Sequence, residues 1–334
     1  MEKNRICMKL LVTGGLGFIG SNFVLSVIKN TNFQVLNVDA EFHGANHYNL
    51  NEIKNDKKYS FVKGNITDKK LMERLISECD CVVNFAAESH VDRSIKDPSP
   101  FLNSNILGTF TILDIIKNQE KRLIHISTDE VFGTILEGSA NEKTRFNPSN
   151  PYAATKASAE LLINSYFVTY NADVVITRCT NNFGPRQFLE KLIPKTIVLA
   201  NQNKKIPIYG KGTSIRDWIY VEDHCQAILK VLEKGKQGES YNISASNETD
   251  NVTIVKKVLE ILGKSEANME FGEKRPGEDI RYSLDSSKIR SELGWEPKIS
   301  LEKGLEETVQ WYMSNEEWLK QNTQEMFSST PWKN

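Results

Sequence analysis

Short apolar runs alternate with amphipathic stretches through the first half of the chain. The apolar runs are Lys9–Thr13, Gln34–Val38, Cys81–Ala87, Leu123–Ser127 and Val174–Arg178. Helical spacing of the apolar positions is found in Phe18–Lys29, Lys69–Ser77, Pro100–Lys117 and about Ala153–Tyr170. Strands that alternate with helices predict an α/β fold, in which a doubly wound parallel sheet is covered by helices on both faces.

The pattern changes after residue 180, where turn-rich segments separate short helical stretches. These segments are Asn181–Pro185, Tyr209–Gly212 and Arg275–Gly277. We therefore expect a Rossmann-type domain over residues 8–180 and a smaller α/β lobe over residues 181–320, with some segments of the lobe returning to the main domain. The final stretch, Ser314–Asn334, is polar with scattered aromatic residues and predicts no element.

Composition excludes several classes of partner. The chain has 334 residues, 39% of them hydrophobic, and a formal net charge of −1, so it lacks the positive field that collects nucleic acid or an anionic membrane surface. The apolar stretch near the start is broken by glycines and fits neither a signal peptide nor a membrane span. The cysteines fit no zinc or redox motif, which predicts reduced thiols, no metal site and a cytoplasmic location; they are Cys7, Cys79, Cys81, Cys179 and Cys225.

A glycine motif follows the first apolar run and opens the first helical stretch. Gly14, Gly17 and Gly20 have the spacing that lets a chain turn tightly and lets a diphosphate approach a helix N-terminus. Asp39 ends the second apolar run, at the place where an acidic residue accepts hydrogen bonds from the adenosine ribose. Because its neighbours Ala40 and Glu41 offer no cation to a 2′-phosphate, the motif favours NAD over NADP. The alternatives are a structural strand-to-helix turn and an ordinary turn aspartate.

Two further pairs carry candidate chemistry. Tyr152 and Lys156 lie four apart at the start of a helical stretch, where an ammonium favours the phenolate and makes tyrosine a usable base. Asp129 and Glu130 follow Thr128 at the end of an apolar strand, where ligands bind in open α/β sheets. Two carboxyls whose pKa values differ can serve as acid and base, as removal of water from adjacent carbons requires. Considered alone, Tyr152 and Lys156 could be two surface residues. Asp129 and Glu130 could likewise belong to a solvated acidic loop.

The combination resembles the extended short-chain dehydrogenase/reductase family, and within it the dTDP-glucose 4,6-dehydratases. Epimerases of that family have no Asp-Glu pair at this place. The resemblance spans roughly Lys9 to Trp311. Beyond the motifs above, it rests on Ala86–Ser94, Asn181–Pro185, Glu190–Pro194, Arg216–His224 and Arg275–Gly277.

The resemblance implies a closed redox cycle that yields a 4-keto-6-deoxy sugar for deoxysugar biosynthesis, such as that of dTDP-rhamnose. Tyr152 would take the proton of the C4 hydroxyl while NAD takes the hydride, and Thr128 would bond that oxygen. Glu130 would remove the C5 proton, Asp129 would protonate the departing C6 hydroxyl, and the hydride would return to C6. Lys156 would tune Tyr152 and hold the nicotinamide ribose.

The resemblance also implies contact residues. Those for the cofactor, beside the three glycines, Asp39, Tyr152 and Lys156, are Phe18, Ile19, Asn65, Ile66, Ala86, Ala87, Ser89, Ser104 and Asn182. Those for the substrate are Ser89, Thr128, Asn181, Lys191, Leu192, Pro207, Tyr209, Arg216, Asn251 and Arg275. The two arginines suit a diphosphate because they form bidentate, charge-assisted bonds.

The chain departs from the family pattern at three places. Asn65-Ile66 stands where relatives carry Asp-Ile, the loop Ala40–Tyr48 lacks the usual Thr-Tyr-Ala-Gly-type run, and Glu278 replaces a common histidine. The first two affect adenosine binding and the third affects the grip on the diphosphate.

The resemblance further implies a homodimer, built by helices within Phe101–Lys117 and Ala153–Tyr170 of each subunit. The nearest alternative functions are a dehydratase for UDP- or CDP-glucose and a nucleotide-sugar epimerase. A dinucleotide-sensing regulator is the alternative outside enzymes, but it has no need of the Tyr–Lys and Asp–Glu pairs.

Overall fold

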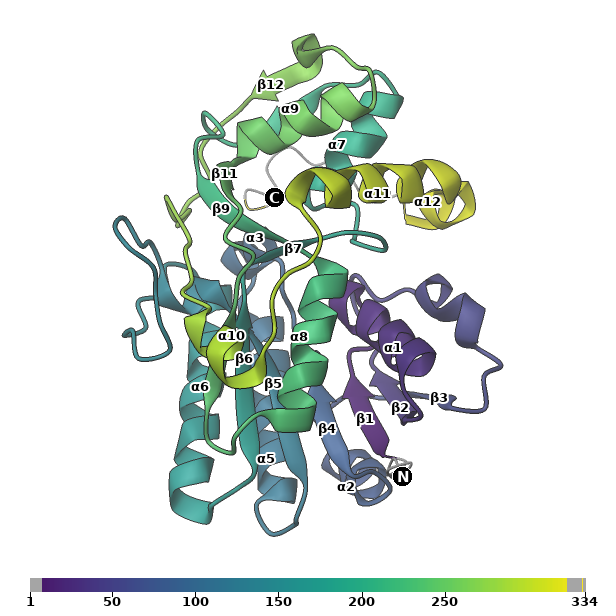
Figure 1. Cartoon of the computed structure of the whole chain (residues 1–334), viewed down its shortest axis with the longest axis vertical. Coiled ribbons are helices and arrows are strands. Elements are labelled where there is room, and N and C mark those ends of the chain that lie inside the picture. The colour runs from purple at the N-terminus through teal and green to yellow at the C-terminus, as the bar shows by residue number, and fades with distance from the viewer. Residues whose placement is uncertain (1–7, 323–331, 333–334) are drawn as a thin grey trace.

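A seven-stranded parallel sheet forms the centre of the computed structural model, which describes residues 8–322 and residue 332 (Figure 1). The strand order is β10-β6-β5-β4-β1-β2-β3. The strands are β1 (Lys9–Thr13), β2 (Gln34–Asp39), β3 (Tyr59–Lys63), β4 (Cys81–Asn84), β5 (Arg122–Thr128), β6 (Val174–Cys179) and β10 (Ser240–Ile243). The predicted Rossmann-type sheet is confirmed, and its last strand, β10, comes from the second half of the chain.

Helices cover both faces of this sheet because its side chains alternate between two apolar cores. In β1, Leu10 and Val12 pack into one core and Leu11 into the other. The first core is closed by α1 (Phe18–Asn30), α8 (Val221–Lys234) and α10 (Ser287–Leu293), and the second by α2 (Lys69–Ser77), α5 (Gly108–Ile116) and α6 (Pro151–Tyr170).

A smaller lobe is stacked on one end of the sheet (Figure 1). It contains a three-stranded sheet in the order β11-β9-β7 and a two-stranded sheet of β12 and β8. Its core includes Phe183, Trp218 and Tyr312. The strands are β7 (Asn181–Phe183), β8 (Ile206–Ile208), β9 (Ile215–Tyr220), β11 (Glu248–Asp250) and β12 (Met269–Phe271), and the helices are α7 (Leu192–Asn201), α9 (Asn251–Ile261), α11 (Leu301–Ser314) and α12 (Glu316–Asn322).

The single helix predicted over Pro100–Lys117 is wrong in detail. The chain forms α4 (Ser99–Phe101), a π-helical turn η2 (Leu102–Leu107) and then α5. The side chain of Asn105 explains the wide turn, because it bonds both backbone groups of Glu88 and the Thr155 hydroxyl of α6. Such turns often occur at functional sites, and this one carries Ser104.

The remaining short elements are α3 (Val91–Lys96) and the 3-10 turns η1 (His47–Ile53), η3 (Asp129–Phe132) and η4 (Glu266–Asn268). Cys79, Cys81, Cys179 and Cys225 are buried free thiols, and Cys7 lies outside the described residues. In the part of the chain that the structure describes, no helix combines the length and apolarity needed to cross a bilayer.

Candidate active site

Two adjoining cavities run from the carboxyl ends of the main sheet into the lobe. The first, of about 320 Å³, is lined by the glycine motif, the ends of β2, β4 and β5, and the start of α6. The second, of about 180 Å³, is lined mainly by the lobe. The cavities share the lining residues Ser89, His90, Glu130, Asn181, Asn182, Gln187, Glu190 and Lys191, so they form one continuous path.

The glycine motif shapes the wall of the first cavity. Gly14 has φ +71°, and a Cβ there would lie 2.6 Å from the backbone nitrogen of Ala86. A Cβ on Gly20 would lie 2.3 Å from the carbonyl oxygen of Gly14. The first turn of α1 follows directly, and no side chain caps it at Gly17. Its backbone N–H groups are therefore suited to an anion such as a diphosphate.

Asp39 lies at the end of β2, on the same cavity. Its carboxylate accepts hydrogen bonds from the backbone nitrogens of Leu16, at 3.0 Å, and Glu41, at 2.8 Å. Burial raises the pKa of this carboxyl, although the two backbone bonds oppose the rise. Lys63 of β3 lies opposite Asp39 in the strand pairing of β2 with β3. Its ammonium is bonded to the carboxylate of Glu41, so this cation already has an acidic partner.

Thr128, Asp129 and Glu130 lie where β5 ends and η3 begins. The Thr128 hydroxyl donates to Asp129 Oδ1 at 3.1 Å and accepts from the Glu130 backbone nitrogen. Burial, reinforced by the charge of Glu130, raises the pKa of Asp129 well above its ordinary value. Its Oδ2 atom is buried and has no hydrogen-bond partner among the described residues. Burial thus favours the protonated form of Asp129, and one oxygen of its carboxyl is left for a ligand.

Glu130 lies at the junction of the two cavities. Its Oε2 atom accepts from Asn150 Nδ2 at 3.3 Å and from the Tyr282 hydroxyl at 3.4 Å. Asn150 also caps α6, because its Oδ1 accepts from the Ala153 backbone nitrogen. The same side chain therefore fixes the helix start and the carboxylate.

Tyr152 and Lys156 lie on the first two turns of α6, and both are buried against the first cavity. Burial, and after it the charge of Glu130, raises the pKa of the Tyr152 phenol well above its ordinary value. Lys156 Nζ donates to the Ile126 carbonyl oxygen at 2.6 Å and lies 3.3 Å from His125 Nε2. The ammonium is therefore held by β5, and burial lowers its pKa to about 8.

The structure brings the candidate residues together in two groups. All positions expected to contact the cofactor line the first cavity, and so does Thr128. The other positions expected to contact the substrate line the second cavity; they are Ser89, Asn181, Lys191, Leu192, Pro207, Tyr209, Arg216, Asn251 and Arg275.

Sequence reasoning missed a bridge across the cavities. Glu190 of the lobe accepts from, or pairs with, His43 Nε2 at 3.0 Å, and the His43 ring stands edge-on to Phe188. His43 lies in the loop that departs from the family pattern, whereas Glu190 directly precedes Lys191. Glu190 opens the segment Glu190–Pro194 on which the resemblance rests, but the resemblance gave it no role.

Both candidate diphosphate arginines have acidic neighbours. Arg216 lies over the Tyr282 ring, and its Nη2 is 3.9 Å from Glu278 Oε1. Arg275 Nη1 donates to Asp92 Oδ1 at 3.2 Å. The departure at Glu278 thus places a carboxylate beside a group that suits an anionic ligand.

Comparisons with known proteins show which family this chain belongs to. Residues 11–308 match the model of a family described as GDP-mannose 4,6 dehydratase. The low-salt glycan biosynthesis protein Agl12 of Haloferax volcanii is 46% identical over 93% of this chain and all of its own length. The dTDP-glucose 4,6-dehydratase of Xanthomonas campestris is 42% identical over 93% of this chain and 94% of its own.

A solved structure matches equally well. The dTDP-glucose 4,6-dehydratase DesIV of Streptomyces venezuelae, with NAD and TYD bound, superposes with a TM-score of 0.91 at 41% identity. The match covers 93% of this chain and 98% of that one.

Proposed function

We propose, from the premise that this chain belongs to the GDP-mannose 4,6 dehydratase family, that it converts dTDP-glucose into dTDP-4-keto-6-deoxyglucose with NAD as its resident cofactor. One observation carries the proposal. The Asp129–Glu130 and Tyr152–Lys156 pairs open into the first cavity close to its junction with the second. An oxidation and an elimination can therefore act on one sugar ring at that junction.

The first cavity fits NAD by its own chemistry. Gly14 and Gly20 leave the space that a Cβ would fill, the N-terminus of α1 faces an anion, and Asp39 suits a ribose without a 2′-phosphate. When bound, NAD accepts the hydride from C4 of the sugar and returns it to C6. The protein supplies placement and proton transfers.

Each proton transfer is assigned to the side chain whose position and protonation suit it. Tyr152, once deprotonated, accepts the proton of the C4 hydroxyl, and the Thr128 hydroxyl bonds the same oxygen. The C4 ketone acidifies the C5 proton, which Glu130 removes. Burial raises the pKa of the Asp129 carboxyl and favours its protonated form, so Asp129 is the group that donates a proton to the leaving C6 hydroxyl.

The second cavity suits the nucleotide. Arg216 and Arg275 provide guanidinium groups for the diphosphate, and Pro207, Tyr209 and Asn251 line the lobe side where the nucleoside would bind. The named relatives favour dTDP-glucose over UDP- or CDP-glucose. An epimerase and a dinucleotide-sensing regulator are disfavoured, since neither needs the acid and base of Asp129 and Glu130.

The direct test is to incubate the purified protein with dTDP-, UDP-, CDP- and GDP-sugars and to record the ultraviolet band of a 4-keto product in alkali. We expect the band with dTDP-glucose, and we expect Tyr152→Phe to abolish it. A band with only UDP- or CDP-glucose would contradict the proposed substrate. No band from any sugar, with protein that contains NAD, would contradict the dehydratase.

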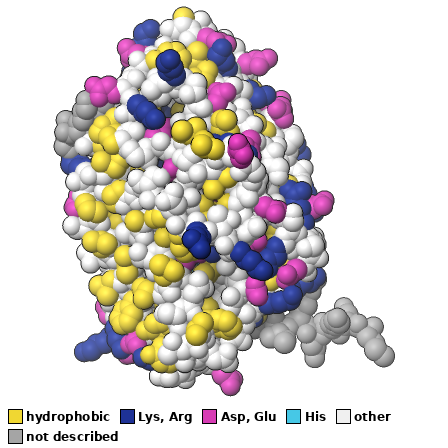
Figure 2. All heavy atoms as spheres, turned by 90° about the vertical axis from the view of Figure 1, so that its left-hand side faces the viewer, with side chains coloured by type: hydrophobic (Ala, Val, Ile, Leu, Met, Phe, Trp, Pro, Cys, Tyr) yellow, Lys and Arg dark blue, Asp and Glu magenta, His cyan; other side chains and the backbone are white. Residues whose placement is uncertain are grey.

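We also propose that the enzyme is a cytoplasmic homodimer whose product enters deoxysugar biosynthesis. The face that carries α6 presents gathered hydrophobic side chains (Figure 2). Val168 is 81% exposed and Leu161 60%, and Leu107 and Phe110 add apolar surface from η2 and α5. A two-fold contact would bury this surface. A sedimentation mass of one chain at micromolar concentration would contradict the dimer, and Val168→Glu should weaken it.

A further inference from the structure

Glu190 joins the lobe to the main domain across the first cavity. Its Oε2 atom lies 3.0 Å from His43 Nε2, in the loop that follows β2, and the centroid of the His43 ring lies 4.6 Å from that of Phe188. Its Oε1 atom lies 3.6 Å from His90 Nε2, and Arg93 Nε lies 3.9 Å from Oε2. The two histidines and the arginine belong to the main domain, so this one carboxylate ties the lobe to two of its segments.

The contact closes one side of the space that suits the cofactor. His43, its loop neighbours Phe42 and Gly44, and Glu190 all line the first cavity. The side chains of His43 and Glu190 are only 16% and 17% exposed, so most of the contact is shielded from water. Because a main-domain wall and a lobe wall of the cavity meet here, a ligand that fills the cavity is enclosed until the two walls part.

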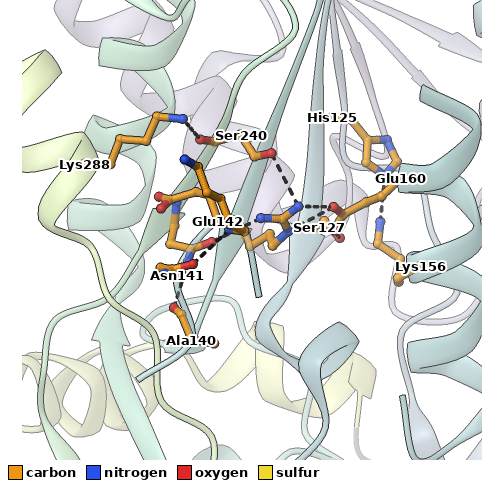
Figure 3. A network of polar contacts seen from close by, with 12 residues as sticks. His125, Ser127, Ala140, Asn141, Glu142, Lys156, Glu160, Ser240 and Lys288 are labelled. Carbon is orange, nitrogen blue, oxygen red and sulfur yellow. Dashed lines mark hydrogen bonds and ion pairs between the residues drawn. The ribbon is translucent and has the colours of Figure 1, made fainter. Parts of the chain in front are cut away.

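Fold stability alone does not account for a carboxylate in this wall. A structural ion pair of the chain lies behind β5, where Arg178 donates to both oxygens of Glu160 at 2.6–3.1 Å (Figure 3), and neither residue lines a cavity of the site. Glu190 instead brings a charge to a cavity suited to an anionic dinucleotide. Burial raises the pKa of the Glu190 carboxyl, but the bond to His43 and the positive charges nearby outweigh burial and bring the pKa to about 2. The carboxylate is therefore ionised and suited to a strong hydrogen bond.

The loop that carries His43 is tied to the residues that suit the adenosine. A backbone N–H near its start donates to Asp39 Oδ1 at 2.8 Å, and the Asn46 backbone nitrogen donates to the Leu16 carbonyl oxygen, within the glycine motif, at 3.0 Å. The loop Ala40–Tyr48 is also a place where the chain departs from the family pattern. The contact with Glu190 is therefore a feature of this chain, and it links the lobe to the wall that suits the adenosine.

We propose that Glu190 and His43 are cofactor-retaining residues, whose contact closes the first cavity over bound NAD and keeps the reduced cofactor in place between the two hydride transfers. The inference rests on the NAD site and the redox cycle of the proposed function. That cycle has a reason to hold its cofactor. Loss of NADH after the oxidation would strand a 4-keto sugar before the hydride reached C6.

The test measures NAD release from protein purified with its cofactor, in the absence of any sugar. Loaded protein is diluted into a solution of an NAD-degrading enzyme, which consumes released NAD, and the NAD that stays on the protein is measured at intervals. His43→Phe keeps a ring beside Phe188 and loses the hydrogen bond, whereas His43→Gln keeps an N–H donor and loses the ring. His47→Phe is the matched control, because His47 Nε2 bonds Glu41 of the same loop at 2.8 Å.

We expect His43→Phe to release NAD about tenfold faster than the wild type, since a hydrogen bond to a charged group changes an equilibrium by about that factor or more. Glu190→Gln should also release NAD faster, because its amide carries no charge. His43→Gln should release NAD nearly as slowly as the wild type, and His47→Phe should release it at the wild-type rate. During turnover of dTDP-glucose, His43→Phe should lose activity progressively and regain it when NAD is added.

Thermal unfolding checks that each variant is folded. Wild-type release rates in folded His43→Phe and Glu190→Gln would overturn the inference. Equal acceleration in His43→Phe and His47→Phe would also overturn it, because a disturbed loop would then be the cause. Release from His43→Gln as fast as from His43→Phe would overturn it too, because the hydrogen bond would not matter.

The same experiments separate this inference from the proposed function. A wild-type protein that purifies without a dinucleotide would refute the NAD site of the proposed function, and this inference would fail with it. If the wild type dehydrates dTDP-glucose and all variants release NAD at one rate, the inference alone fails.

Discussion

Replacing Asp129 by asparagine should separate the oxidation from the elimination. Burial and the charge of Glu130 raise the pKa of the Asp129 carboxyl well above its ordinary value, which favours the protonated form that a general acid needs. Asparagine has the same shape and keeps the bond from the Thr128 hydroxyl to Oδ1. It has no acidic proton to give to the leaving hydroxyl.

Asp129→Asn should lose the rate acceleration that one general acid contributes. Such groups contribute about 10²–10⁴-fold in rate, equivalent to about 3–5 kcal/mol of barrier. The folding stability of Asp129→Asn should not fall together with its catalytic rate. A carboxyl whose pKa is raised in the folded state contributes stability that is fully present below its unfolded pKa and is lost as the pH rises through the folded value. Asp129→Asn does not suffer that loss, so at neutral pH it should unfold at no lower temperature than the wild type.

The assay mixes each variant with dTDP-glucose in deuterated water and follows two signals. One is the near-ultraviolet absorbance of enzyme-bound NADH, and the other is deuterium entering C5. In Asp129→Asn we expect NADH to form and persist, with continued exchange at C5. Glu130→Gln should form NADH without exchange, and Tyr152→Phe should give neither signal.

Two results would refute this reasoning. Wild-type turnover by Asp129→Asn would show that the buried carboxyl is not the acid. Absence of NADH in a folded, NAD-loaded Asp129→Asn would show that the residue is needed for oxidation and that the two steps are not divided between the pairs.

Three further predictions follow from individual contacts. Glu278→Gln should lower KM for dTDP-glucose several-fold, because Arg216 loses a carboxylate neighbour; steady-state kinetics with an unchanged KM would contradict this. Arg178→Met should destabilise the fold by about 3–5 kcal/mol, because Glu160 is left buried without its cation, and urea unfolding measures the loss. The protein should purify with NAD, as Asp39 indicates, and mass analysis that finds mainly NADP would count against that assignment.

Local sequence patterns predicted much of the fold. The ranges Lys9–Thr13 and Lys69–Ser77 coincide with β1 and α2, because each run of apolar positions faces a continuous core. Strand β3 (Tyr59–Lys63) was not predicted, since it is an edge strand with partly exposed side chains and little apolar pattern. The π turn at Leu102–Leu107 was missed because Asn105, a tertiary contact, decides it.

Motifs located the candidate site, and the resemblance to the dTDP-glucose 4,6-dehydratases is confirmed by the comparisons. The roles of individual residues remain proposals. What the sequence could not predict are distances through space. Lys156 was expected to lower the pKa of Tyr152, yet its ammonium is bonded to β5, and burial dominates the phenol. His125 has no motif of its own, and its place opposite Lys156 depends on the packing of α6 against β5.

Strand β10 has a consequence for how this chain is made. It pairs with β6, whose residues are all buried, although roughly sixty residues of the lobe separate β10 from the end of the predicted first domain. At ribosomal rates of about 5–20 residues per second, the nascent sheet waits about 3–12 s for its last strand. During that time β6 is an apolar edge of the kind that templates aggregation. A fragment that stops at residue 180 would keep this edge permanently, so we expect it to require a chaperone or to precipitate, while the full chain completes its own sheet.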